Sequence, residues 1–327
     1  MAEPPIYVSA SDAERLLDPA SVLRVIETAL KDLSDGRIVN GSKGGFSLND
    51  QDGQRHMGAI SGCDVAAGVA GVKWFAACDG NGRRGLPRVP ATILLCDAVT
   101  GLLTGVVDAT SLTAVRTAAL AVTAIRSCLS GPLRRAAIVG FGPIGQTIAR
   151  YLPAEIDVAE IVIASGNAAA EAFARSMDTA TSPRFTVEPR LDHAVRDSDL
   201  VVTATGLSAD APLVDANWLK RGATVCALGS YQEIDSRIIS GADRIFVDNW
   251  EAGRQRGNLA PLVRSGALTR EQIDGEVADV VAGKIEGCSS SDQTVLIVLV
   301  GIGALDIALG AELLKHARFQ GIGRPLG

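Results

Sequence analysis

The stretch Ala136-Ala137-Ile138-Val139-Gly140-Phe141-Gly142-Pro143-Ile144-Gly145 decides the fold. Its first four residues are a short apolar run, which is typical of a buried parallel strand. Gly140, Gly142 and Gly145 give the spacing G-x-G-x-x-G, and Gln146 to Leu152 predicts the helix that follows. This order of strand, turn and helix predicts a dinucleotide-binding fold, whose glycines allow a tight turn, close approach of a pyrophosphate and close helix–strand packing.

The same stretch supplies the first predicted cofactor-binding residues. The amino end of the helix after the turn offers free N–H groups and a partial positive charge to a phosphate. We therefore predict that NAD or NADP binds along the turn, at Gly140, Gly142, Pro143, Ile144 and Gly145.

The end of the second predicted strand bears on which of the two cofactors is used. The strand Ile161–Ala164 runs into Ser165-Gly166-Asn167, where an acidic residue for the adenosine ribose would be expected. Without a carboxylate a 2′-phosphate is not repelled, and Ser165 and Asn167 can hydrogen-bond it, so the sequence favours NADP. An ordinary polar turn before a helix explains the same two residues, and this alternative stays open.

Composition excludes several classes of function. The chain has 327 residues, of which 47% are hydrophobic, and a net charge of −6, which argues against a nucleic-acid partner. The six cysteines form no C-x-x-C pair and the three histidines are not spaced as ligands, so no metal site is predicted. The first residues show no basic region followed by an apolar stretch, so we expect no signal peptide. Val295 to Leu309 is predicted to be a buried element that is too short for a membrane span, and we therefore expect a cytoplasmic protein.

Hydrophobic patterning predicts two regions of different architecture. The first 117 residues predict an α+β region with the following elements: a strand at 6–8, helices capped by Ser11 and beginning at Pro19, a strand meander over 39–71, strands at 71–77, 91–97 and 102–107, and a helix from Ser111 to about Leu129. From residue 136 the order strand, helix, strand predicts a parallel sheet, with further strands at 161–164, 200–204 and 224–228 and the last one at 244–248.

Two cations stand on apolar elements near the dinucleotide strand. Lys73 lies within Val72-Lys73-Trp74-Phe75, and Arg116 lies in a helix of Ala, Leu and Val beside Thr113 and Thr117. An arginine can hold a carboxylate with two hydrogen bonds, and a lysine supplies a point charge or a proton. Together with a cofactor turn, the pair predicts a carboxylate-binding pocket, although each cation alone could be half-buried at the surface.

The chain resembles the ornithine cyclodeaminase/mu-crystallin family along nearly its whole length. The shared motifs occur in the family's order: Gly71-Val72-Lys73-Trp74, Gly85-Leu86-Pro87, Thr100-Gly101, Thr113 to Ala119, Gly140 to Gly145, Thr203-Ala204-Thr205, Gly229-Ser230-Tyr231 and Gly303-Ala304-Leu305-Asp306. The resemblance implies a homodimer and a Rossmann NAD(P)-binding domain, residues 118–302, inserted into an α+β substrate-binding and dimerisation domain, residues 1–117 plus 303–327.

The resemblance also implies roles for single residues. Lys73 and Arg116 would bind the substrate carboxylate, joined by a basic residue that matches Lys43, and Lys73 would be catalytic. Cofactor binding is implied for Thr117, Thr203, Thr205, Gly229 and Asp306, although Asp306, as a helix residue, could equally be structural.

One position separates the branches of this family. True cyclodeaminases carry an aspartate in the loop where this chain has Gly229-Ser230-Tyr231, as the family's reductases and dehydrogenases do. Ser230 is a substrate-binding candidate, but a serine cannot take a proton near neutral pH. The resemblance therefore implies an NAD(P)(H)-dependent oxidoreductase acting on the C–N bond of a small amino or imino acid, such as a ketimine reductase or an amino-acid dehydrogenase, with local similarity to N-(2-amino-2-carboxyethyl)-glutamate dehydrogenases. The alternatives are an ornithine or lysine cyclodeaminase and a non-catalytic ligand-binding protein.

Overall fold

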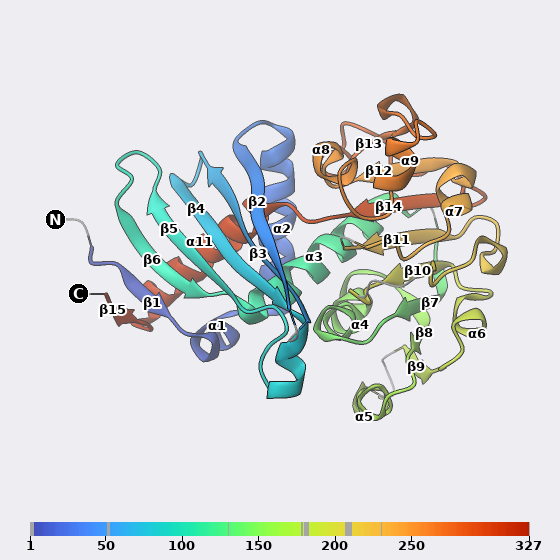
Figure 1. Ribbon diagram of the computed structural model, residues 1–327, viewed down its shortest axis with the longest axis horizontal. Helices are drawn as coiled ribbons and strands as arrows, with labels where there is room; N and C mark the ends of the chain where they lie inside the picture. Colours follow the sequence, from blue (N-terminus) through green and yellow to red (C-terminus); the bar gives the residue numbers. More distant parts are fainter. Residues whose placement is uncertain are drawn as a thin grey trace. The chain divides into compact units, whose positions relative to one another are not determined.

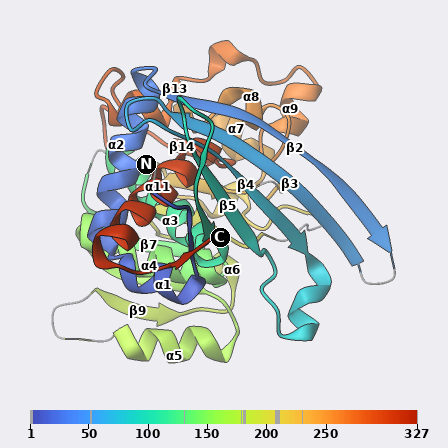
Figure 2. The same cartoon turned by 90° about the vertical axis from the view of Figure 1, so that its left-hand side faces the viewer.

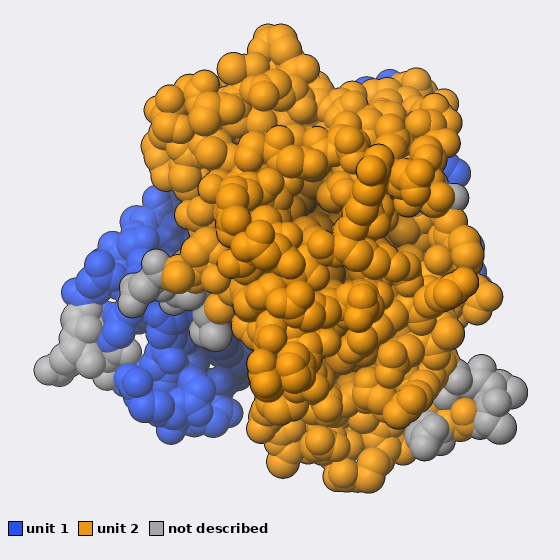
Figure 3. Space-filling view, turned by 90° about the vertical axis from the view of Figure 1, so that its right-hand side faces the viewer, with its two compact units in different colours: residues 1–117, 302–327 blue, residues 118–301 orange. Residues whose placement is uncertain are grey.

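The computed structural model describes residues 3–50, 53–129, 131–177, 179, 183–206, 211–229 and 231–326. The chain divides into two compact units, which Figure 3 colours separately. Unit 1 comprises residues 1–117 and 302–327, and unit 2 comprises residues 118–301. Helix α3 (Thr110–Cys128) carries the chain from the first unit into the second.

Unit 1 is built on a seven-stranded sheet in the order β15-β1-β6-β5-β4-β3-β2 (Figure 1). The central strands are antiparallel neighbours, and β1 adds to the edge of β6 in parallel. Figure 2 shows that β2 and β3 reach beyond β4 and β5. The strand bounds are β1 Ile6–Val8, β2 Ile38–Asp50, β3 Gly53–Asp64, β4 Val69–Cys78, β5 Ala91–Asp97, β6 Leu103–Asp108 and β15 Arg324–Pro325.

One face of this sheet is covered by α11 (Gly303–Gln320), which lies between the sheet and α2 (Pro19–Ser34) (Figure 2). β5 shows the resulting alternation, since Ala91, Ile93 and Leu95 are buried while Thr92 and Leu94 are exposed. Because α11 has neighbours on both sides, its first two turns are buried all round.

The amino-terminal helices begin at side-chain caps. Asp18 accepts a hydrogen bond from Ser21 N, and Pro19 occupies the first turn of α2. The predicted cap of the first helix is wrong by two residues: Ser9, not Ser11, caps α1 (Ala10–Leu16). Ser9 and Asp12 form a reciprocal capping box, which a cap at Ser11 would not allow. A 3-10 helix, Asp79–Arg84, follows β4.

Unit 2 is built on an eight-stranded parallel sheet in the order β13-β12-β14-β11-β10-β7-β8-β9 (Figure 1). The predicted dinucleotide strand is β7, which lies inside the sheet between β10 and β8. The strands are β7 Leu133–Val139, β8 Val158–Ala164, β9 Arg184–Val187, β10 Leu200–Thr203, β11 Thr224–Leu228, β12 Arg244–Val247, β13 Gly275–Glu276 and β14 Val295–Leu299. The predicted α/β class, a Rossmann-like unit inserted into an α+β unit, is confirmed.

The helices of unit 2 alternate with its strands, as crossover connections require. They are α4 Pro143–Glu155, α5 Ala168–Met177, α6 Leu191–Val195, α7 Ser236–Gly241, α8 Trp250–Gly253, α9 Ala260–Arg264 and α10 Val277–Val281, with 3-10 turns at Ala216–Trp218 and Arg270–Gln272. None of the helices in the described parts of the chain is both long and apolar enough to cross a membrane.

The prediction for the last strands of the sheet is wrong in two respects. The strand at 244–248 is not the last, because β14 lies between β11 and β12 in the sheet. The segment Val295 to Leu309 is likewise two elements instead of one. Val295–Leu299 is a fully buried strand, the chain turns at Gly301 with φ of 96°, and α11 begins at Gly303.

Candidate active site

Three charged side chains from different elements of unit 1 meet in its interior. Lys73 stands on β4, Arg116 on α3 and Asp306 in the first turn of α11. Lys73 Nζ donates to Asp306 Oδ1 at 2.8 Å, and Arg116 Nε donates to the same oxygen at 2.9 Å. The exposed fractions are 2% for Lys73, 6% for Arg116 and 1% for Asp306. We call these three residues the cation cluster.

Burial and mutual attraction set the charges of the cation cluster. Burial lowers the pKa of Lys73 to about 8, with Asp306 opposing the shift and Arg116 reinforcing it. Burial alone would raise the pKa of Asp306, but Arg116 and Lys73 more than offset it and hold that pKa below its usual value. At neutral pH, therefore, two cations surround one anion, and the cluster carries a net charge of +1.

The cluster keeps donors that no described residue uses. Arg116 bonds Asp306 through Nε, and its two terminal nitrogens make no hydrogen bond with any residue in the described ranges. Asp306 Oδ2 is also buried without a partner among those residues. A buried net positive charge with a free guanidinium fork is suited to one carboxylate.

The strand period explains why Lys73 is buried. Lys73 pairs with Ile60 on β3 and Ile93 on β5, and all three side chains lie on the face that α11 covers. Trp74, the next residue, points to the opposite face and is 47% exposed. The lysine therefore occupies a core position of β4.

A β-bulge brings Lys43 to the same face. The ladder between β2 and β3 pairs Asn40 with Gly62 but Lys43 with Ile60, so one extra residue is inserted between them. In a regular ladder Lys43 would oppose Ala59 and point to the other face. Its ammonium group instead lies 4.8 Å from the centre of the Phe75 ring, while that of Lys73 lies 6.0 Å from the same ring.

Close packing fixes the start of α11, which carries Asp306. Asn40 Oδ1 accepts a hydrogen bond from Ala304 N at 3.1 Å and so binds the first turn of the helix. A Cβ added to Gly303 would lie 1.9 Å from Ile60 Cγ2, and one added to Gly62 would lie 2.7 Å from Ala304 Cα. Helix and sheet therefore touch through their backbones at this point.

Two predicted cofactor-binding residues belong to unit 1. Asp306, assigned from the resemblance, lies between the two predicted carboxylate-binding cations. Thr117 donates its hydroxyl to Thr113 O at 2.7 Å, within α3. The other cofactor-binding predictions fall in unit 2.

The glycine turn of unit 2 has the shape that a dinucleotide needs. Gly140 has φ of 98°, and a Cβ there would lie 2.8 Å from the backbone nitrogen of Thr205. A Cβ on Gly145 would lie 2.2 Å from Gly140 O, whereas one on Gly142 would meet no atom within 4 Å. Gly142 begins α4 without a side-chain cap, which leaves the helix amide groups open to a phosphate. These residues fit a bound pyrophosphate.

The predicted ribose-binding residues take part in the turn after β8. Asn167 Oδ1 accepts from Ala170 N at 2.8 Å, and Ser165 Oγ accepts from Asn167 N at 3.4 Å. These contacts build the start of α5, and the choice between NAD and NADP stays a prediction.

The remaining predicted residues lie at the carboxyl ends of β10 and β11. Thr203 is buried, and Thr205 binds the carboxylate of Glu233 through its backbone and its hydroxyl group. Gly229 has φ of 98° directly after β11. Ser230 lies outside the described residues.

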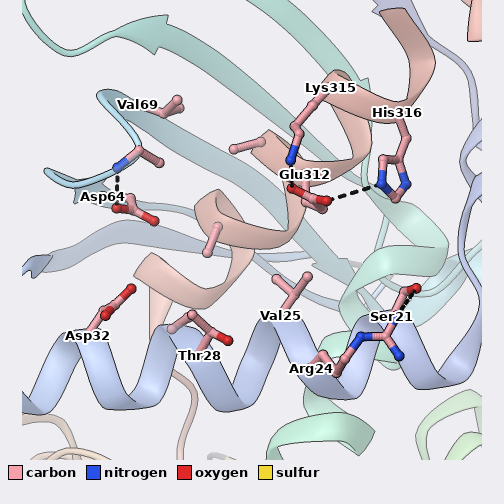
Figure 4. Close-up of a pocket in the computed structure, with 14 residues that line it drawn as sticks. Ser21, Arg24, Val25, Thr28, Asp32, Asp64, Val69, Glu312, Lys315 and His316 are labelled. Carbon is pink, nitrogen blue, oxygen red and sulfur yellow. Dashed lines mark hydrogen bonds and ion pairs between the residues drawn. The ribbon is translucent and has the colours of Figure 1, made fainter. Parts of the chain in front are cut away.

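A groove of about 760 Å³ in unit 1 is a competing site (Figure 4). It lies along α2 and α11, and none of its lining residues belongs to the cation cluster. Glu312 pairs with both Lys315 and His316, and none of the charged residues that line the groove is buried. The groove thus lacks the uncompensated buried charge that distinguishes the cluster.

Sequence reasoning missed three residues that shape these sites. Phe75 is two positions after Lys73, and this spacing alone would have placed its ring beside the lysine. Asn40 and Glu233 gave no comparable signal, because their contacts join segments far apart in the chain.

Comparisons with known proteins assign the chain to a family. A sequence model of the ornithine cyclodeaminase/mu-crystallin family matches residues 6–316. The chain is 26% identical over 264 residues to N-((2S)-2-amino-2-carboxyethyl)-L-glutamate dehydrogenase of Staphylococcus aureus, covering 79% of this chain and 77% of the relative.

Solved structures show the same fold. The Thermococcus litoralis Delta(1)-pyrroline-2-carboxylate reductase, in complex with NADH and L-proline, superposes with a TM-score of 0.90 at 22% identity, covering 98% of this chain and 100% of the other. An archaeal alanine dehydrogenase dimer with bound NAD gives a TM-score of 0.90 at 24% identity, with 99% of each chain covered. Because the family match spans almost the entire length, the chain belongs to the ornithine cyclodeaminase/mu-crystallin family.

Proposed function

We propose that this protein is an NAD(P)(H)-dependent oxidoreductase acting on the C–N bond of a small amino or imino acid. The observation that carries the proposal is the cation cluster, a buried group with a net positive charge and a guanidinium fork whose terminal nitrogens bond no described residue. The glycine turn of unit 2 supports the cofactor, and the names of the relatives support the reaction class.

The substrate carboxylate would bind Arg116 and Lys73. Arg116 donates two parallel hydrogen bonds from its terminal nitrogens, because its Nε is already held by Asp306. Lys73 Nζ has one hydrogen on Asp306 and two more to offer. Lys43, on the same face of the sheet, adds a third positive charge near the Phe75 ring.

Lys73 would also move the proton of the reaction. When bound, a nicotinamide would supply the hydride for reduction of the imine carbon, or accept it from the amine carbon in the reverse direction. Reduction places one proton on nitrogen, and an ammonium group with a pKa of about 8 can give it directly or through a water. Asp306 holds that ammonium in place and stays ionised.

We further propose a preference for NADP and a homodimer. Ser165 and Asn167 present no carboxylate to a 2′-phosphate. The sheet of unit 1 exposes apolar side chains on the face away from α11, namely Phe46, Leu48, Trp74 and Leu94. A second copy of the chain is the occupant we propose for this face, in line with the alanine dehydrogenase dimer.

The test is oxidation of NADH and NADPH, followed by absorbance, with cyclic ketimines and with 2-oxo acids plus amines. We expect turnover with at least one carboxylate-bearing imine, and none with the matching carboxamide. Lys73→Ala should abolish that turnover and leave dinucleotide binding nearly unchanged. Release of ammonia from ornithine or lysine without net change in NADH would instead indicate a cyclodeaminase.

A further inference from the structure

A second buried carboxylate lies in unit 2, at the carboxyl end of the parallel sheet. Glu233, five residues after β11, is 1% exposed. Its Oε1 accepts hydrogen bonds from Thr205 N at 3.0 Å, from Gly206 N at 3.2 Å and from the Thr205 hydroxyl group. One carboxylate oxygen thus holds two successive amides, those of Thr205 and Gly206, in the loop that leaves β10.

This loop packs directly against the glycine turn. A Cβ on Gly140 would lie 2.8 Å from both the nitrogen and the Cα of Thr205, so the first glycine rests directly on the Thr205 backbone. Gly145 in turn rests on Gly140, since its Cβ would lie 2.2 Å from Gly140 O. A displacement of Thr205 would therefore be passed to the turn that receives the pyrophosphate.

The backbone of Glu233 is itself held by a hydrogen bond to Asn258. Asn258 Oδ1 accepts from Glu233 N at 2.8 Å and from Ile234 N at 3.1 Å, and Asn258 is fully buried. Glu233 Oε2 is buried without a hydrogen-bond partner in the described part of the chain. A buried carboxylate that lacks a cationic partner among the described residues depends on its hydrogen-bond donors, so the position of Glu233 and the positions of its three donors are coupled.

We propose that Glu233 is a positioning residue for the dinucleotide: through Thr205 it sets the glycine turn that binds the cofactor. The inference rests on the proposed function, because it assumes that the turn binds NAD(P). Glu233 is not predicted to touch the reacting atoms. Its substitution changes the affinity for the cofactor, whereas the cation cluster binds the substrate carboxylate.

The test measures dinucleotide affinity by the fluorescence of NADH and NADPH, without substrate. Glu233→Gln puts an NH2 group where Oε2 has no hydrogen-bond partner among the described residues, and it leaves a neutral amide oxygen to accept the three hydrogen bonds. We expect its Kd to rise about tenfold, as for loss of one charge-assisted hydrogen bond. With substrate, the KM for the dinucleotide should rise while kcat at saturation stays within about twofold.

Glu160→Gln is the matched control. Glu160 lies on β8 of the same sheet and accepts from the Thr186 hydroxyl group at 3.2 Å, but it stands towards the amino end of its strand. Its Kd should equal that of the wild type. If Glu233→Gln does not fold, Glu233→Asp, which keeps the charge but is shorter, should raise the Kd in the same direction.

The outcomes separate the two proposals. If the wild type binds a dinucleotide and a folded Glu233→Gln binds it equally well, the role of Glu233 is wrong while the proposed function stands. A lower melting temperature with an unchanged Kd would likewise reduce Glu233 to a structural role. If the wild type binds neither dinucleotide, the proposed function fails and this inference fails with it.

Discussion

Lys73 combines a positive charge with almost complete burial, so its protonation is the most pH-sensitive feature of the candidate active site. Its pKa of about 8 lies below the ordinary 10.5, chiefly because burial disfavours the charged form. Both carboxylate binding and proton donation need that charged form. We therefore predict that kcat/KM for imine reduction falls about tenfold per pH unit above pH 8. A profile that stays level up to about pH 9.5 would contradict this role of Lys73.

Asp306 bonds both cations, and its removal should lower the free energy of unfolding by an amount that depends on pH. Asp306→Asn leaves Lys73 and Arg116 buried without their anion, which costs about 3–5 kcal/mol of unfolding free energy. The pKa of Lys73 should fall further, because Asp306 raises it in the wild type. A lysine whose folded pKa is depressed destabilises the fold below that pKa, and the penalty disappears as the pH rises towards 10.5.

Denaturant unfolding at two pH values tests this prediction. The loss of unfolding free energy in Asp306→Asn should be larger near pH 6 than near pH 9. The fall of activity at alkaline pH should begin at a lower pH in this variant than in the wild type. Asp79→Asn, at the exposed pair with Arg88, should stay within about 0.5 kcal/mol of the wild type. A loss in Asp306→Asn that is equal at both pH values would show that the lysine charge is not its cause.

The sequence predicted two members of the cation cluster but not its geometry. Lys73 and Arg116 stood out as cations in apolar surroundings, a local signal. Asp306 was placed near the cofactor because of the resemblance, and its bonds to both cations join residues 190 and 233 positions apart. No local pattern encodes such contacts.

The junction between α11 and β3 shows how an element positions a side chain. Gly303→Ala would place a methyl group 1.9 Å from Ile60 Cγ2 and push the first turn of α11 away from the sheet. We predict a loss of about 1–3 kcal/mol in unfolding free energy, with reduced turnover because Asp306 moves with the helix. Denaturant unfolding and the imine assay measure the two effects.

Gly82→Ala is the control for this substitution, because a Cβ there meets no atom within 4 Å. It should leave stability and turnover unchanged. If Gly303→Ala behaves like Gly82→Ala, the helix start is not held as tightly as the packing indicates.

Most elements could be predicted from sequence, and the exceptions have physical reasons. β7, β8, β10 and β11 are apolar runs bounded by turn residues, and such runs are predictable. The short β9 carries little apolar signal, and the apolar run of β14 continues into α11, which hid their boundary at Gly301. The bulge before Lys43 changes which face a side chain occupies without a clear change in composition.

At the scale of the whole molecule, we predict that the protein dimerises through the sheet face of unit 1 that exposes apolar side chains. Trp74→Glu would put a charge among the exposed apolar side chains of that face, so we expect the variant to sediment as a monomer where the wild type sediments as a dimer. Val99→Glu, at an 89% exposed position in the turn between β5 and β6, should leave the dimer intact. A wild type that is monomeric at micromolar concentration would refute the proposal.

The large-scale organisation was the easiest part to infer from the sequence. The glycine turn fixed the Rossmann-like unit, because only glycines fit the contacts of Gly140 and Gly145. The return of the chain into unit 1 through α11 followed from the family resemblance and not from any periodicity.

We propose that the buried cations of unit 1 bind a substrate carboxylate, and ligand binding to Arg116→Gln is the sharpest test of this role. Calorimetry in the presence of dinucleotide would compare pyrrole-2-carboxylate, a planar analogue of a cyclic ketimine, with pyrrole-2-carboxamide. The wild type should bind the carboxylate and not the amide, and Arg116→Gln should weaken carboxylate binding by at least about 100-fold, the loss of a bidentate ionic contact. Equal carboxylate affinity in the two proteins would show that Arg116 does not bind the substrate carboxylate.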